Sequence, residues 1–142
     1  MTPVRQTIFV ADHPKGYGNC QSACLASILD LPLSDVIDTT SDEVRDNGFW
    51  GPIYDWLADH GLKVVHVGQN DPRLQGQYSI AAGPSPRGPF HHAIICKNGV
   101  MVWDPHPSDD GLLEIKMHDL LVPLTKVEKM LHAADRDRDR EQ

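Results

Sequence analysis

A cysteine, a histidine and an aspartate occur in this sequence in the order and settings that nucleophilic catalysis requires. Cys20 follows the turn residues Gly18 and Asn19, and it opens a segment whose apolar residues repeat at helical spacing until Leu31-Pro32. We therefore predict Cys20 in the first turn of a helix, with Asn19 as the N-cap. Unpaired N–H groups and the helix dipole favour a thiolate there, and a thiolate can attack a carbonyl carbon. The alternative is that Cys20 is only a small buried apolar residue.

The histidine and the aspartate belong to the clearest hairpin pattern in the chain, two β-type runs around Lys97-Asn98-Gly99. If the loop is Asn98-Gly99 alone, His92 points to the face opposite Asp104, and Asp104 pairs diagonally with His91. If all three residues form the loop, with Gly99 in the left-handed conformation, His92 lies directly opposite Asp104 on one face. A glycine in the third place favours this second register, in which Asp104 can fix the imidazole tautomer.

Two stretches carry a family resemblance: Gly18-Asn19-Cys20-Gln21-Ser22-Ala23-Cys24-Leu25, and His92-Ala93-Ile94-Ile95 with Asp104-Pro105. They resemble the papain-like cysteine peptidase superfamily. The likeness is greatest to its small bacterial branch, near the bacteriocin-leader-processing peptidases and the acyl-transferring, transglutaminase-like proteins. It extends weakly over residues 6 to 105, and small proteins of bacteria and their phages share it.

The resemblance implies a role for each member of a Cys-His-Asp triad. Cys20 would be the nucleophile, His92 the general base and acid, and Asp104 the residue that orients the imidazole. Papain-like enzymes also place a glutamine side chain in the oxyanion hole, a few residues before the cysteine. Pro14 and its neighbours occupy that position here, so Gln6 and Asn19 are both retained as candidates.

A loop rich in proline and glycine, residues 83–89, leads directly into the histidines of the hairpin. We expect this loop to border the substrate cleft, and we take Ser85, Arg87 and His91 as candidate substrate-binding residues. The implied reaction is attack on an amide bond of a peptide, an isopeptide or a glutamine-type substrate, through a thioester intermediate. Water and a second amine remain alternative acceptors.

The chain has a helical first half and a second half of short β-type runs, which predicts an α+β fold of the papain-like kind. The helix carrying Cys20 would pack on a C-terminal antiparallel sheet. Residues 1–132 would form one domain, and the alternating charges of residues 133–142 predict a disordered tail. The expected strands are residues 7–10, 62–67, 77–82, 93–96, 100–104 and 112–116.

Composition narrows the functional classes. The 142 residues carry a net charge of −7, which argues against nucleic acid as a partner. No apolar run approaches membrane-spanning length and the first residues lack a signal-peptide pattern, so we expect a cytoplasmic protein with no membrane partner. Three cysteines argue for reduced thiols, and Cys24 and Cys96 are expected in the core. The proposed chemistry needs no cofactor and no metal.

Two other classes stay open. The displaced oxyanion residue is compatible with a non-catalytic binding module that keeps the fold but has lost turnover. Less favoured is a zinc site built from Cys20, Cys24 and a histidine pair, because the spacing of the two cysteines lacks a second paired motif. Among the other candidates, Trp50 is expected to be a packing residue, and His106 has no evident partner in the sequence.

Overall fold

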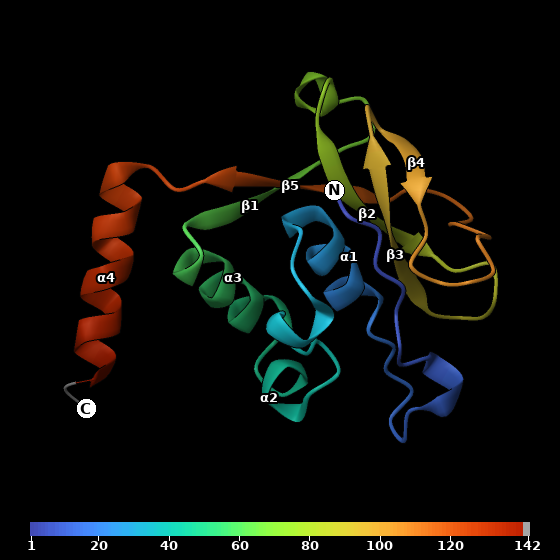
Figure 1. The fold of residues 1–142 in the computed structure, drawn as a ribbon, viewed down its shortest axis with the longest axis horizontal. Coiled ribbons are helices and arrows are strands. Elements are labelled where there is room, and N and C mark those ends of the chain that lie inside the picture. Colours follow the sequence, from blue (N-terminus) through green and yellow to red (C-terminus); the bar gives the residue numbers. More distant parts are fainter. Residues whose placement is uncertain (141–142) are drawn as a thin grey trace.

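The computed structural model describes residues 1–140 as helices packed on a five-stranded antiparallel sheet (Figure 1). The strands lie in the order β1-β5-β2-β3-β4. Helix α1 packs against β3 and β2 in the middle of the molecule, and α3 packs against β1 at one edge of the sheet. The predicted α+β class is therefore confirmed.

Helices α1 and α2 begin at residues that the local sequence pattern indicates. Ser41 caps α2, because its Oγ accepts a hydrogen bond from the Val44 N–H. Helix α1 begins at Cys20, as predicted, and Asp30 closes it in the left-handed conformation just before Leu31-Pro32. The α-helices are α1 Cys20–Leu29, α2 Asp42–Arg45, α3 Trp50–Asp59 and α4 Lys126–Arg140; the short 3-10 helices are η1 Val10–Asp12, η2 Leu33–Asp35 and η3 Pro72–Leu74.

The sheet places the last strand of the chain in its interior, between β1 and β2. Its strands are β1 Leu62–Val67, β2 Tyr78–Pro84, β3 His91–Lys97, β4 Val100–Trp103 and β5 Met117–Pro123. Every paired neighbour is antiparallel. As a result, the connection from β1 to β2 passes the position of β5, and the connection from β4 to β5 passes β3 and β2.

Two expected strands are absent from the described residues. Residues 7–10 form no ladder, because the N–H groups of Thr7 and Ile8 donate to the Asn19 side chain instead. Residues 112–116 bond to β2 only at isolated points, Leu113 to Pro84 and Lys116 to Ala82, and this spacing of three does not match the period of two in a ladder. The strand begins only at Met117.

The β3–β4 hairpin has a two-residue turn, so the prediction of a three-residue loop was wrong. Lys97 pairs with Val100, and the turn residues Asn98 and Gly99 have φ of 53° and 76°. These positive values are typical of a type I′ turn, which the right-handed twist of a hairpin favours over the turn we predicted.

A two-residue turn alone would put His92 and Asp104 on opposite faces of the hairpin, but a β-bulge in β4 reverses this effect. Cys96 pairs with Met101, but Ile95 pairs with Trp103, so that Val102 is an extra residue in β4. The register continues from Ile95 and Trp103 toward His92 and Asp104, which regain a common face. The predicted juxtaposition is therefore present, although the reason given for it was not the correct one.

The main core lies between the sheet and helices α1 and α3. It contains Cys24, Leu25, Ala26, Val36, Ile53, Leu57, Ile80, Ala93 and Ile95. A second cluster, of Ala81, Ile94 and Cys96, is covered by Leu112 and Ile115 from the irregular segment before β5. Both Cys24 and Cys96 are core residues, as predicted, and the burial of Cys24, Leu25 and Ala26 in the main core holds α1 on the sheet.

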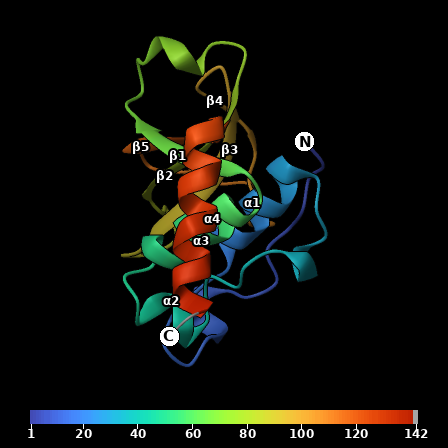
Figure 2. The ribbon, with the colours of Figure 1, turned by 90° about the vertical axis from the view of Figure 1, so that its left-hand side faces the viewer.

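Helix α4 lies at the end of the molecule beside α3, and it stands in front of α3 in Figure 2. His132 and Arg136 both bind the Asp59 carboxylate, which ties the helix to the end of α3. Helix α4 continues past residue 132 to Arg140, with ion pairs along its last turns, and so includes most of the segment that was expected to be a charged tail. Residues 141–142 of the predicted tail lie outside the described residues. No helix within residues 1–140 has the length and apolarity needed to cross a membrane.

Candidate active site

Cys20 is the first residue of α1, and its side chain lines a cleft of about 550 Å³. The start of β3 supplies His92 to the same cleft. Cys20 is half-buried, whereas Cys24 and Cys96 are fully buried and have no access to the cleft. Burial raises the pKa of Cys24 well above its usual value and that of Cys96 to about 11. Cys20 is thus the cysteine available for reaction.

His92 and Asp104 form a buried pair, with the imidazole Nε2 at 2.7 Å from the carboxylate Oδ1. Only 3 % of His92 and 2 % of Asp104 are exposed. Because Nε2 is occupied by Asp104, Nδ1 is the ring nitrogen that remains for Cys20. The three side chains of the predicted triad therefore come together in the order Cys20, His92, Asp104.

The Asp104 carboxylate is held by more than the imidazole. Its Oδ1 accepts from the His106 N–H, and its Oδ2 accepts from the Gly111 N–H, each at 2.8 Å. Arg5 fastens the same loop from outside, because its guanidinium donates to the carbonyls of Asp104 and His106 and pairs with Asp109, each at 2.9 Å. These contacts fix the position and the charge of Asp104.

The electrostatics of the pair favour an imidazolium beside a carboxylate. Burial lowers the pKa of His92, but hydrogen bonds to Asp104 and Cys20 raise it, and the result is a pKa of about 9. Burial raises the pKa of Asp104, but hydrogen bonds from His92, His106 and Gly111 lower it below its ordinary value. At neutral pH the imidazole is therefore positioned and charged to donate a proton.

Of the two oxyanion candidates, Gln6 lines the cleft and Asn19 does not. Asn19 is buried, its Oδ1 accepts from the N–H groups of Thr7 and Ile8, and its Nδ2 donates to Thr7 Oγ1. It also makes no side-chain cap on α1, so the N-cap interaction predicted for it is absent. Asn19 instead fastens the N-terminal segment to the start of α1.

Gln6 lines the cleft, and its amide is incompletely used. Its Nε2 donates to the Ile8 carbonyl at 3.0 Å, which leaves the second Nε2 hydrogen available. Its Oε1 is the only buried side-chain polar atom in residues 1–140 without a hydrogen-bond partner. Gly18 lies between Gln6 and Cys20 in the fold, and a Cβ there would lie 3.4 Å from Gln6 Nε2 and 3.3 Å from the Ile8 carbonyl. The glycine allows Gln6 to approach the helix start.

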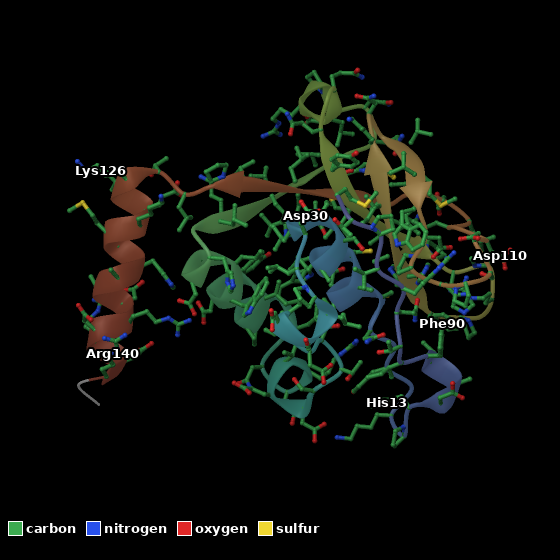
Figure 3. The ribbon with its side chains drawn as sticks, in the orientation of Figure 1. His13, Asp30, Phe90, Asp110, Lys126 and Arg140 are labelled. Atoms are coloured by element: carbon green, nitrogen blue, oxygen red, sulfur yellow. The ribbon has the colours of Figure 1, made fainter. Side chains whose placement is uncertain are left out.

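The three expected substrate-binding residues divide into two groups. Arg87 and His91 line the cleft, as proposed from their place before His92. Ser85 does not line it, because this residue is buried, bonds through its N–H to the Phe90 carbonyl, and accepts the Arg87 N–H on its Oγ. It shapes the loop instead. Phe90, labelled in Figure 3, follows this loop directly before β3 and lines the cleft.

Other cleft residues had no signal in the sequence. Arg45, at the end of α2, and Phe49 and Trp50, at the start of α3, line the side of the cleft formed by the first half of the chain. Trp50 was expected to be only a packing residue. His106, which had no partner in sequence, lies with its ring centre 6.2 Å from that of His92. An arginine or tryptophan in a short helix cannot be assigned to a cleft until the helix is placed.

No group of three or more histidine, cysteine, aspartate or glutamate side chains in residues 1–140 could hold a metal ion. The suggested zinc site would need Cys24, which is buried in the core. Comparison with models of known protein families, with curated proteins and with solved structures gave no match. The site has to be interpreted from its own geometry.

Proposed function

We propose that this protein is a papain-like cysteine hydrolase or acyltransferase that acts on an amide bond through Cys20, His92 and Asp104. The observation that carries the proposal is the buried His92 imidazole, bonded through Nε2 to Asp104 and adjoining Cys20 at the start of α1. The cleft along these residues supplies the space for a substrate. A nucleophile beside a base that a third group orients is an arrangement typical of covalent catalysis.

In the first half-reaction the Cys20 thiolate attacks the carbonyl carbon of the amide. A C–S bond forms while the carbonyl electron pair moves to oxygen. The tetrahedral intermediate then collapses, the C–N bond breaks, and the His92 imidazolium gives its proton to the leaving amine. The product of this step is a thioester on Cys20, with a neutral imidazole beside it.

In the second half-reaction water or an amine attacks the thioester carbonyl. His92 takes the proton of the attacking molecule, the C–S bond breaks, and the thiolate of Cys20 is regenerated. Asp104 stabilises the imidazolium in both half-reactions and keeps Nδ1 directed at the reacting atoms. A water acceptor makes the protein a hydrolase, and an amine acceptor makes it an acyltransferase.

The developing oxyanion needs donors close to Cys20. Cys20 is the first residue of α1, so its backbone N–H has no partner inside the helix. This N–H lies at the N-terminal end of the helix, where the dipole is positive. The unused Nε2 hydrogen of Gln6 is the second donor. This assignment replaces the glutamine a few residues before the cysteine with one fourteen positions earlier in the chain.

Labelling with p-nitrophenyl acetate tests the proposal. The wild-type protein should release a burst of p-nitrophenolate and carry one acetyl group, which peptide mapping should place on Cys20. Mild iodoacetamide should likewise modify Cys20 well before Cys24 or Cys96, because only Cys20 reaches the cleft. The Cys20→Ala variant is the matched control and should show neither reaction.

Two results would count against the proposal. If Cys20, Cys24 and Cys96 are modified at equal rates, Cys20 is not an activated nucleophile. If Cys20 is modified rapidly but the acetyl group is never transferred to water or to an added amine, the protein is a binding module that has lost turnover.

A further inference from the structure

The cleft around Cys20 differs in charge from the rest of the molecule. The chain has 20 acidic residues against 13 lysines and arginines. Among residues 1–140, however, no aspartate or glutamate lines the cleft, whereas the two guanidinium groups of Arg45 and Arg87 do. A cationic cleft in an anionic protein concentrates its field on the bound molecule and attracts anions.

Arg45 is a half-buried cation without a carboxylate partner in this part of the chain. The arginines that form ion pairs within residues 1–140 are Arg5, Arg73, Arg136, Arg138 and Arg140. The Nε of Arg45 donates to the Thr39 carbonyl at 2.7 Å. Its four Nη hydrogens have no hydrogen-bond partner among the described residues, and a guanidinium can use these to hold a carboxylate with two parallel bonds.

Two aromatic rings hold this guanidinium in place. Its central carbon lies 4.2 Å from the centre of the Tyr17 ring and 4.8 Å from that of Phe49. Phe49 has φ of 64°, a strained conformation for a bulky residue, and this conformation directs the chain from α2 into α3. Trp50 follows and stacks on Tyr54 at 5.6 Å. Arg45 is thus pre-oriented at the edge of an aromatic surface that also lines the cleft.

Arg45 and the nucleophile Cys20 line the same cleft. Burial lowers the pKa of Arg45, whereas the negative forms of Tyr17, Cys20 and Asp38 raise it, and none of these three forms an ion pair or a hydrogen bond with its guanidinium in residues 1–140. An anion bound by Arg45 would therefore lie near the amide carbonyl that Cys20 attacks.

We propose that Arg45 is a specificity-determining residue that binds a substrate carboxylate beside the scissile amide, with Phe49 and Trp50 contacting an adjoining apolar group. The inference rests on the proposed function, because the carboxylate belongs to the substrate of that reaction. The substrate class is a peptide with an acidic side chain or a free carboxyl terminus next to the bond attacked by Cys20.

Two alkylating reagents of nearly equal size test this inference. Iodoacetate carries a carboxylate and iodoacetamide a neutral amide, and both react with Cys20. The rate constant for iodoacetate divided by that for iodoacetamide should fall on the order of tenfold in Arg45→Gln, because a charge-assisted hydrogen bond of the usual strength is lost. Arg45→Lys should keep part of the ratio. Arg73→Gln, which removes an equal charge from an exposed ion pair with Asp71, should leave the ratio unchanged.

Competition with peptides separates the two sources of a carboxylate. Acetyl-glycyl-glutamate amide has an acidic side chain, acetyl-glycyl-glutamine has a free carboxyl terminus, and acetyl-glycyl-glutamine amide has neither. One of the first two should slow iodoacetamide labelling of Cys20 in the wild type and lose this protection in Arg45→Gln. The neutral amide should protect less than the better of the charged pair.

The outcomes distinguish a failure of the inference from a failure of the proposed function. Rapid, His92-dependent labelling of Cys20 with an unchanged ratio in Arg45→Gln overturns the inference alone. If both reagents slow equally, Arg45 stabilises the thiolate and does not select the substrate, which also overturns it. Labelling of Cys20 no faster than that of a free thiol overturns the proposed function. If Arg45→Gln fails to fold by circular dichroism, the Arg45→Lys ratio and the peptide competition on the wild type decide the question.

Discussion

The molecule contains two histidine–aspartate pairs of almost the same geometry in different surroundings. His92 Nε2 lies 2.7 Å from Asp104, and His66 Nδ1 lies 2.6 Å from Asp119. Both aspartates are buried. The first pair adjoins Cys20 in the cleft, whereas in the second the other ring nitrogen of His66 bonds to the Tyr54 hydroxyl at 2.8 Å.

The two carboxylates are held differently. Asp104 accepts hydrogen bonds from an imidazole and two backbone N–H groups, and these lower its pKa although burial raises it. Within residues 1–140, the only hydrogen bond to the Asp119 carboxylate comes from His66, and burial raises the pKa of Asp119 above its ordinary value. A firmly ionised Asp104 can stabilise an imidazolium, and Asp119 does so less well.

A close histidine–aspartate contact is therefore not by itself sufficient for the proposed reaction. The His66 pair joins β1, β5 and α3, and Trp50 packs its ring 4.8 Å from that of His66. This pair links the β1–β5 edge of the sheet to α3, next to Trp50, which lines the cleft. What distinguishes His92 is its burial, its firmly held carboxylate and its neighbouring thiol.

The largest effect should come from removing each imidazole in turn. His92→Ala should lower acetylation of Cys20 by p-nitrophenyl acetate by about 10²- to 10⁴-fold, the usual range for a lost general acid–base group. His66→Ala should leave most of the rate, because its second nitrogen faces Tyr54 and not a thiol. Equal losses in the two variants would contradict the distinction, provided that circular dichroism shows both to be folded.

The matched carboxylate substitutions should give a smaller effect. Asp104→Asn removes a charge-assisted hydrogen bond worth about 1.5–3 kcal/mol, which corresponds to roughly 10- to 150-fold in acetylation rate. Asp119→Asn should change the rate little, although it can destabilise the β1–β5 pairing. Stopped-flow release of p-nitrophenolate measures both. A rate in Asp119→Asn as low as in Asp104→Asn would show that the His66 pair also acts on catalysis.

The pH dependence of the free energy of unfolding tests the charge state of the His92 pair. His92 has a pKa raised from its ordinary 6.5 to about 9 in the folded protein. Its protonation therefore stabilises the fold fully below pH 6.5, and this stabilisation is lost as the pH rises through about 9. Urea unfolding of the wild type and of His92→Gln, compared across this range, should show the difference between them shrinking with increasing pH.

Nuclear magnetic resonance titration provides a direct check of the same prediction. The ring proton signals of His92 should titrate near pH 9, and Cys20→Ser should lower that midpoint, because the Cys20 side chain contributes to the shift. Asp104→Asn should lower it as well. A His92 midpoint near 6.5 in the wild type would contradict the electrostatic account of the pair.

Much of the fold followed from local patterns in the sequence. The start of α1 at Cys20 and the Ser41 cap were predictable, because turn residues and apolar spacing act within a few positions. The absent strand at 112–116 was not, since Leu112 and Ile115 satisfy the same apolar pattern by packing as a loop under the second cluster. A period of apolar residues does not reveal whether the backbone has a neighbouring strand to pair with.

The site shows the same division. Residue types and the family resemblance singled out Cys20, His92 and Asp104, although the predicted hairpin register was wrong and a bulge places His92 and Asp104 on one face. Gln6 could not be preferred over Asn19 until the cleft lining and the Asn19 hydrogen bonds were known. The hydrogen bond between His66 and Asp119 joins β1 to β5 across a sequence separation of 53 residues, and nothing in either strand alone indicates it. Arg45 likewise became a candidate only when its lack of an ion-pair partner in residues 1–140 could be seen.

The smallest expected effect concerns the two-residue turn of the hairpin that carries His92 and Asp104. Gly99 has φ of 76°, and a Cβ there would meet Gln69 at 3.5 Å and Leu74 at 3.7 Å, which are ordinary contacts. The cost of Gly99→Val is therefore conformational, about 1–2 kcal/mol of the free energy of unfolding, and urea denaturation can measure it. Asn98→Gly, at the neighbouring position of positive φ, introduces no backbone strain but removes the hydrogen bond that Asn98 Oδ1 accepts from the Gly76 N–H, so it should cost about 0.5–1.5 kcal/mol and serves as the comparison for a loss without strain.

The folded fraction of Gly99→Val should nevertheless keep its acetylation rate. The bulge at Val102 gives His92 and Asp104 a common face under the two-residue turn, and an unbulged three-residue loop would give them a common face as well. Either register of the variant thus preserves the pair. A folded Gly99→Val protein that no longer acetylates Cys20 would show that the turn, and not the bulge, controls the geometry of the pair in the cleft.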